Sequence, residues 1–398
     1  MEKRQAKKST KKKNTTKKVI TKTGNKPVKE EIQNKVITKK HNGIISFWKF
    51  MFCFMIVVFH GKLFAKSSKD AILIGGSIGV EFFFIVSGYL MTKSALKKKD
   101  DTNESIGNET LKYVWKKYKS FIPYTLVTGI IGLIVYNIYN NPGIIKNLST
   151  IHEILLFRMT GIRCLTVNIP TWYISSMLIC MIILYPLIRK YKENFIYIVA
   201  PLIVLLGIGY LLHDYKNLRG PGIWLGITFK GNIRAFAELA LGSIVYLLSE
   251  KIKSIKFTNF GKLFITFIEI GSFILIFLIS HFMESGIKYD GILLFIITVG
   301  ITLAFSEQTL EYNFLCNKFS YWLERLSLTL YMIHWSVRFF FINFEPVKDL
   351  RYSIKLSAYT LSTLVLGIIL MYIMDFLKKR NYFIPKFKNI IIKEKIEA

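Results

Sequence analysis

Cysteine is scarce in this 398-residue chain, and the motifs of several common enzyme classes are missing. The 4 Cys form no Cys-x-x-Cys pair and no metal-ligand spacing, so we expect small buried side chains and no metal site. The sequence also has no P-loop, no Rossmann-type glycine turn and no zinc-site pattern. The missing motifs argue against a nucleotide-binding P-loop or Rossmann fold and against zinc-dependent catalysis.

Acidic residues are also few, with 25 Asp and Glu against 55 Lys and Arg, and the excess is unevenly spread. Residues 1–42 hold 15 Lys and Arg and no apolar periodicity, a composition that predicts a disordered basic tail. Basic segments beside a membrane gain about 1 kcal/mol per residue from anionic lipid, so we expect membrane lipid, and not nucleic acid, as the partner of this tail. Residues 378–398 form a second basic tail.

Long apolar runs dominate the rest of the chain. The composition is 52% hydrophobic with 32 Phe, and the mean hydropathy is +0.37. A helix needs about 20 mostly apolar residues to cross a bilayer. We therefore predict an all-α polytopic membrane protein whose transmembrane domain covers residues 43–377. Its ten expected spans are 44–64, 71–92, 118–139, 169–189, 194–212, 231–249, 260–281, 289–306, 320–343 and 355–377.

The basic residues between the spans predict the orientation. Lys clusters follow the second, fourth, sixth and tenth segments, on the same side as the basic N-terminal tail. The positive-inside rule then places both termini in the cytoplasm. The Lys- and Ile-rich composition suits a bacterial genome, so we expect the protein in a bacterial cytoplasmic membrane.

Three ionisable residues within the first two segments indicate a function. Lys49 and His60 lie in the first segment and Glu81 in the second, where each charge costs about 2.5–3.5 kcal/mol on insertion scales. The 11-residue separation of Lys49 and His60 corresponds to ~16 Å of helix rise and about three full turns. We therefore expect both side chains on one helix face, at different depths.

The predicted topology brings six polar residues from different segments to the outer half of the membrane. A histidine beside a carboxylate can accept a proton from an alcohol, so this layer suits general acid–base chemistry. The residues are His60, Glu81, Arg234, Glu238, His334 and Arg338.

Each of these residues also has a purely structural interpretation. His60 and His334 suit an interfacial position, and Arg234 with Glu238 suits an i, i+4 salt bridge. We expect Arg338 to extend to the outer surface. Trp172 and Trp335 also suit the aromatic belt at a membrane interface. Ser87-Gly88 also suits a small-residue contact between helices.

Several of these motifs resemble the acyltransferase-3 family of integral-membrane O-acyltransferases over roughly residues 43–377. The matching features are Lys49 with ten residues to His60; Gly79 to Gly88; Trp172-Tyr173; Arg234 to Gly242; and Ser327 to His334. The first two of these features, at this spacing, are the most specific.

The resemblance implies transfer of an acyl group, often acetyl from acetyl-CoA, to a hydroxyl of a cell-surface carbohydrate. We expect His60 as catalytic base and Glu81 as its orienting partner. The family's fused extracellular esterase-like domain is missing here, so a separate extracytoplasmic transferase is a possible partner. The expected donor-binding residues are Lys49, Lys93 and Lys117, and the expected acceptor-binding residues are Trp172, Arg234, Glu238 and His334.

Two positions depart from the family pattern. The family usually has Arg where Lys49 stands, and lysine keeps the charge but lacks the planar two-pronged guanidinium. Near the start of the third segment, Lys117 and Pro123 fit, but Ser120 replaces a common basic residue. Each departure predicts either an altered donor or a loss of activity.

Two other functions stay open at this stage. A transporter or flippase would use the buried His and Glu as a proton relay, although no repeat and no matched pair of interrupted helices is found. A catalytically silent scaffold would depend on its basic tail to recruit partners.

Overall fold

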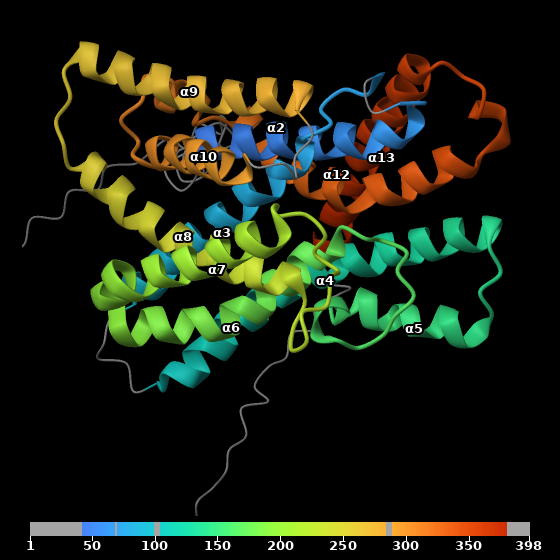
Figure 1. Cartoon of the computed structure of the whole chain (residues 1–398), viewed down its shortest axis with the longest axis horizontal. Coiled ribbons are helices and arrows are strands. Elements are labelled where there is room, and N and C mark those ends of the chain that lie inside the picture. Colours follow the sequence, from blue (N-terminus) through green and yellow to red (C-terminus); the bar gives the residue numbers. More distant parts are fainter. Residues whose placement is uncertain (1–41, 68–69, 99–103, 284–288, 380–398) are drawn as a thin grey trace, which may run out of the picture. The chain divides into compact units, whose positions relative to one another are not determined.

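Ten helices of 16 residues or more form most of the structure, a computed structural model that describes residues 42–67, 70–98, 104–283 and 289–379 (Figure 1). The predicted basic tails, 1–42 and 378–398, lie almost entirely outside these residues. The long helices are α2 (Gly43–His60), α3 (Gly79–Lys97), α4 (Ile106–Tyr139), α6 (Thr171–Asn194), α7 (Ala200–Tyr215), α8 (Lys230–Lys253), α9 (Asn259–Phe282), α10 (Asp290–Phe305), α12 (Lys318–Asn343) and α13 (Tyr352–Lys379).

Each of the ten predicted segments overlaps one of these helices, which confirms the all-α prediction for the described residues. Within the described ranges the only β-type pairing is an isolated bridge between Trp224 and Phe229. Five stretches are long and apolar enough to cross a membrane: 43–64, 106–139, 171–215, 259–282 and 352–379. The count of ten membrane spans and the cytoplasmic placement of both termini remain predictions.

Two regions differ from the sequence-based expectation. The second helix begins at Gly79, not near residue 71, because the preceding chain bends tightly against α9. Gly75 donates its N–H to Ser280 O at 2.8 Å, and a Cβ on Gly75 would lie 2.5 Å from Met283 O. The predicted loop 140–168 contains an unexpected helix, α5 (Ile144–Ile154), which follows α4 as a hairpin.

Side-chain caps fix where several helices begin. Asn42 caps α2 by accepting the N–H of Ile45 at 3.1 Å, and Asn317 caps α12 by accepting that of Ser320 at 2.9 Å. A helix leaves its first N–H groups without partners, so a cap of this kind contributes about 1 kcal/mol. These two caps set the register of the helices that carry Lys49 and His334.

A close helix crossing joins α3 to α8 through two glycines. A Cβ on Gly88 would lie 2.1 Å from Leu239 O, and one on Gly242 would lie 2.4 Å from Ile85 O. Only glycine permits this backbone approach, as at small-residue contacts between membrane helices. The crossing brings Glu81 of α3 beside the first turns of α8.

Helices α2 and α12 run in the same direction along each other. Their contacts progress in order along both chains, from Ser46 with Glu324, through Cys53 with the carbonyl of Ser327, to His60 with His334. Lys49 and His60 both contact α12, as their predicted position on one face requires. This pairing positions the site described below.

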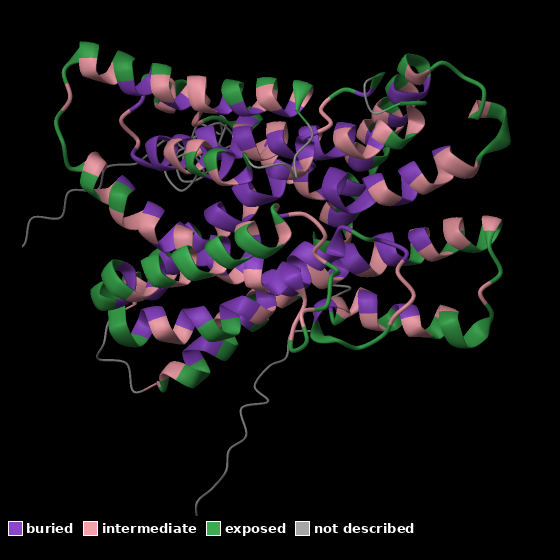
Figure 2. Cartoon of the chain, viewed as in Figure 1, coloured by how far each residue is buried: buried purple, intermediate pink, exposed green. Residues whose placement is uncertain are grey.

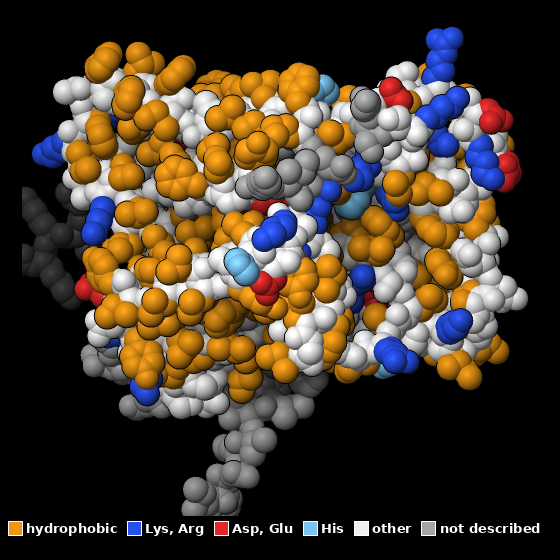
Figure 3. Space-filling model, viewed as in Figure 1, with side chains coloured by type: hydrophobic (Ala, Val, Ile, Leu, Met, Phe, Trp, Pro, Cys, Tyr) orange, Lys and Arg blue, Asp and Glu red, His pale blue; other side chains and the backbone are white. Residues whose placement is uncertain are grey.

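The outward faces of several helices are strongly apolar. Figure 2 shows exposed residues along α7 and α9, and Figure 3 shows hydrophobic side chains over most of the visible face. Phe260 and Phe267 of α9 are 78% and 74% exposed, and Leu205 of α7 is 69% exposed. An apolar surface of this extent fits contact with lipid.

Candidate active site

Two histidines from α2 and α12 form the centre of the site. The rings of His60 and His334 stack, with their centroids 5.2 Å apart and an interplanar angle of 28°. His334 Nδ1 lies 2.7 Å from the carbonyl of Tyr331, an acceptor, so Nδ1 must carry the proton. His334 Nε2 is then the proton acceptor, and it has no hydrogen-bond partner among the described residues.

Trp335 and Arg338 enclose His60 on the α12 side. The ring of Trp335 meets His60 edge-on at 5.1 Å, and the Arg338 guanidinium lies 4.2 Å from the centre of the Trp335 ring. Arg338 Nε donates to the carbonyl of His60 at 3.0 Å. The expectation that Arg338 extends to the surface is wrong, because this bond and the Trp335 ring hold a side chain that is only 8% exposed.

A separate charged cluster joins α3 to α8. Arg234 donates through Nε to Glu238 at 2.8 Å, and its Nη2 lies 2.6 Å from Glu81 as an ion pair without hydrogen-bond alignment. Its Nη1 donates to the carbonyl of Leu218 at 3.1 Å. All three charged side chains are at most 3% exposed. Burial of this kind requires charges to be paired, so the cluster holds the two helices together.

Glu81 therefore lies with Arg234 and does not contact His60 in the described structure. The reason is geometric: Glu81 is on the face of α3 that packs on α8, whereas His60 faces α12. The i, i+4 pair of Arg234 and Glu238 is confirmed as a salt bridge. Trp172, 7% exposed, packs against Arg234 at 5.7 Å and so does not face lipid.

A cavity of about 360 Å³ opens beside the other end of the α2–α12 pair. We name it the lysine cavity, because Lys49, Lys117 and Lys378 lie in its wall together with Glu324 and Arg325. Deeper wall residues are aromatic or hydroxylated, and include Tyr173, Ser87 and Tyr331. The volume is at the lower end of the roughly 300–1,000 Å³ typical of small-molecule sites.

The three predicted donor-binding lysines are placed differently. Lys49 and Lys117 lie in the cavity wall, whereas Lys93 is exposed, lies 5.6 Å from the Tyr89 ring and is not among the lining residues. Lys49 forms an ion pair with Glu324, which also accepts a hydrogen bond from Ser46 at 2.8 Å. Sequence spacing gave no signal for Glu324 or Lys378, because both come from distant helices.

Tyrosine rings connect the lysine cavity to the histidines. Tyr331 lines the cavity, and its ring lies 5.8 Å from that of His334, one helical turn further along α12. Tyr173 lies 5.9 Å from Tyr331 and shares a hydrogen bond with Ser87 at 3.0 Å. The spacing of Tyr331 and His334 places both on one helix face, a signal that the sequence analysis missed.

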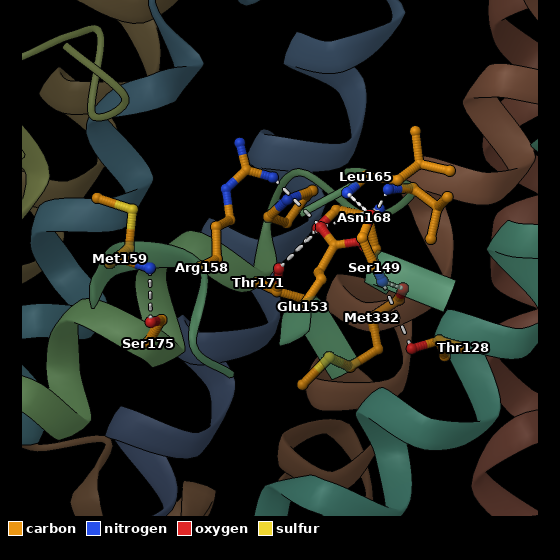
Figure 4. Close-up of polar contacts among 12 residues, drawn as sticks. Thr128, Ser149, Glu153, Arg158, Met159, Leu165, Asn168, Thr171, Ser175 and Met332 are labelled. Atoms are coloured by element: carbon orange, nitrogen blue, oxygen red, sulfur yellow. Dashed lines mark hydrogen bonds and ion pairs between the residues drawn. The ribbon is translucent and has the colours of Figure 1, made fainter. Parts of the chain in front are cut away.

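The loop between α5 and α6 is fixed against this region by Glu153 (Figure 4). Its carboxylate accepts the N–H of Val167 at 2.7 Å and of Asn168 at 3.2 Å, and pairs with Arg158 at 3.2 Å. Burial raises the pKa of Glu153, and these partners oppose the rise. Asn168 in turn donates to the carbonyl of Met332 at 2.9 Å, which ties the loop to α12.

The same loop holds Tyr331 in place. The Tyr331 hydroxyl donates to the carbonyl of Pro170 at 2.7 Å, just before α6 begins. Sequence periodicity would not reveal such a contact, since it joins residues 161 positions apart. The loop before α6 thus positions both the cavity wall and the histidine-bearing turn of α12.

The fold and site together define a helical membrane protein with a buried histidine pair and a basic cavity. Comparison with known families then matches residues 42–375 to the acyltransferase domain of the acyltransferase-3 family. The chain belongs to this family. The recognised motifs, from Lys49 to His334, all lie inside the matched region.

One curated relative shares a shorter segment. The chain is 37% identical over 75 residues to the peptidoglycan O-acetyltransferase OatA of Listeria monocytogenes serovar 1/2a. The match covers 19% of this chain and 11% of the relative, so the chain spans only a small part of that protein. No solved structure matches the chain.

Proposed function

We propose that the protein is a membrane O-acyltransferase that moves an acyl group, most simply acetyl, from acyl-CoA to a hydroxyl of a cell-surface polysaccharide or its lipid-linked precursor. The observation that supports this most directly is the lysine cavity, whose wall residue Tyr331 contacts His334 of the stacked histidine pair. Family membership supplies the acyl transfer, and the OatA segment supports a glycan acceptor.

The lysine cavity suits the acyl-CoA donor. Coenzyme A carries several phosphate charges, and Lys117 and Lys378 supply cations at the cavity wall. Lys49 is neutralised by Glu324, so its contribution to phosphate binding requires that this ion pair open. The aromatic wall beyond these lysines would line the pantetheine arm, with the thioester directed toward the histidines.

The reaction follows from the histidine geometry. In our proposal His60 removes the proton from the acceptor hydroxyl, whose oxygen attacks the thioester carbonyl carbon. A C–O bond forms, the C–S bond breaks, and the proton passes to the departing thiolate. Two imidazolium rings with centroids 5.2 Å apart would repel each other, so a neutral His334 leaves His60 free to take the proton.

The remaining candidates act through position in this proposal. Glu81 and Glu238 orient Arg234, whose guanidinium packs on Trp172 beside the aromatic wall. The exposed Lys93 is then left outside the donor site. We place the lysine cavity on the cytoplasmic side of a bacterial cell membrane, where acyl-CoA is made. A separate extracytoplasmic transferase could complete the transfer.

The test uses purified protein in detergent with radiolabelled acetyl-CoA and a soluble peptidoglycan fragment as acceptor. We compare wild type with His60→Ala and with His213→Ala, a matched control whose side chain is 84% exposed. We expect His60→Ala to lose at least a hundredfold in transfer rate, the usual contribution of a general base, while acetyl-CoA binding is retained. Equal transfer by His60→Ala and wild type would overturn the proposed role of His60.

A further inference from the structure

A second cavity lies at the opposite end of the α2–α12 pair from the lysine cavity. Its volume is about 310 Å³, and we name it the Trp335 cavity. Three elements form its wall: α4, the loop before α6, and the last turns of α12. The wall residues used below are Gly132, Thr166, Trp335, Ser336, Arg338 and Asn343.

Its wall presents polar groups that the protein leaves unused. The Ser336 hydroxyl, on a residue that is 2% exposed, has no hydrogen-bond partner among the described residues. Asn343 donates its side-chain N–H to the carbonyl of Phe339 at 2.7 Å. The side-chain carbonyl oxygen of Asn343 therefore does not face this carbonyl. A buried hydroxyl without a partner is unfavourable, so a ligand that forms a hydrogen bond with Ser336 would recover this lost energy.

Gly132 of α4 keeps space open beside that hydroxyl. A Cβ there would lie 3.2 Å from Ser336 Oγ and 3.2 Å from a methyl carbon of Val167. The cavity therefore depends on the absence of a side chain at this position. The loop that forms the remaining wall is the one that Glu153 fixes through Val167 and Asn168.

The cavity shares wall residues with the surroundings of His60. Trp335 lines the cavity and meets the His60 ring edge-on at 5.1 Å, while Arg338 lines it and donates to the His60 carbonyl. The lysine cavity reaches the same histidine pair through Tyr331. The histidines are thus linked by direct contacts to two cavities at opposite ends of the helix pair.

We infer that the Trp335 cavity is the acceptor subsite and that it binds one sugar residue of a carbohydrate. Aromatic rings together with hydroxyl, amide and guanidinium groups match a ligand that has apolar C–H faces and many hydroxyls. The cavity volume favours a single sugar residue over a longer oligosaccharide. The claim that the bound sugar supplies the reacting hydroxyl rests on the proposed function, whereas the claim that the cavity binds a sugar does not.

The experiment measures binding directly, with a GlcNAc–MurNAc disaccharide and acetyl-CoA as separate probes of the purified full-length protein. Thr166→Trp fills the cavity from the loop, and Ser336→Ala removes the unused hydroxyl without adding volume. The matched control is Thr160→Trp, which adds the same bulk at an exposed position of the same loop.

We expect Thr166→Trp to weaken disaccharide binding at least tenfold and Ser336→Ala to weaken it about threefold, with acetyl-CoA binding unchanged in both. Thr160→Trp should bind both probes as wild type does. Wild-type disaccharide binding by Thr166→Trp, or a wild-type protein that does not bind the disaccharide, would overturn the inference.

The two proposals fail separately. Disaccharide binding that depends on Thr166 and Ser336, without acyl transfer by wild type, would support the sugar site and reject the proposed reaction. Acyl transfer with an acceptor KM that Thr166→Trp leaves unchanged would support the reaction and reject this site.

Discussion

Removal of Arg234 should destabilise the protein more than removal of other arginines that form ion pairs. Arg234→Met leaves Glu81 and Glu238, at 3% and 0% exposure, without a counter-charge. Breaking a buried ion pair from one side costs about 3–5 kcal/mol. For soluble domains 1 kcal/mol shifts the melting temperature by roughly 2–4 °C, so we expect a loss of about 10 °C in detergent.

The comparison variants test the cause of this loss. Arg234→Met combined with Glu81→Gln and Glu238→Gln leaves neither of these two carboxylates charged and unpaired, so most of the lost stability should return. The control Arg325→Met removes a half-exposed ion pair with Asp375 and should cost about 1 kcal/mol or less. The assay is the fraction of protein that stays monodisperse on size-exclusion chromatography after heating.

A melting temperature of Arg234→Met equal to that of wild type would refute the argument that burial makes this cluster essential. A triple variant no more stable than Arg234→Met would refute the role of unpaired charge.

Three further predictions concern the lysine cavity, the crossing of α3 and α8, and the loop before α6. Lys117→Ala should raise the KM for acetyl-CoA about tenfold with little change in kcat. The control is Lys116→Ala at the exposed neighbouring position, which should leave the KM unchanged. Equal KM values for Lys117→Ala and wild type would contradict a donor-binding role of Lys117. Gly88→Leu should prevent assembly of α3 on α8, judged by expression and size-exclusion profile, while Gly209→Leu, which meets nothing within 4 Å, should behave as wild type. Glu153→Leu should lower the free energy of unfolding by about 2–3 kcal/mol, because it leaves buried N–H groups unpaired. The measurement is the melting temperature, which should fall. An unchanged melting temperature would show that Glu153 does not fix this loop.

The helices were predictable because their apolar runs are long. Each of the ten predicted segments overlaps a helix. The amphipathic α5 was missed because it is only 11 residues long and lies between polar stretches. The start of α3 was misplaced because Gly75 contacts α9, a tertiary feature that local sequence does not encode.

The site was predictable only in part, for a physical reason. Helical periodicity correctly placed Lys49 and His60 on one face, and the i, i+4 spacing correctly paired Arg234 with Glu238. Depth in the membrane does not determine which helices touch, so Glu81 was assigned to His60 when it pairs with Arg234. Partners from distant segments, such as Glu324, leave no local signal.

In our account the protein transfers an acyl group to a surface glycan, with His60 as the general base. The most direct test of this claim compares ester-linked acetate on cell-wall glycans from a deletion strain that carries the wild-type, His60→Ala or His213→Ala gene at matched protein levels. We predict that wild type and His213→Ala restore the acetate and that His60→Ala does not. Restoration by His60→Ala, or acetate that does not change on deletion, would contradict the account.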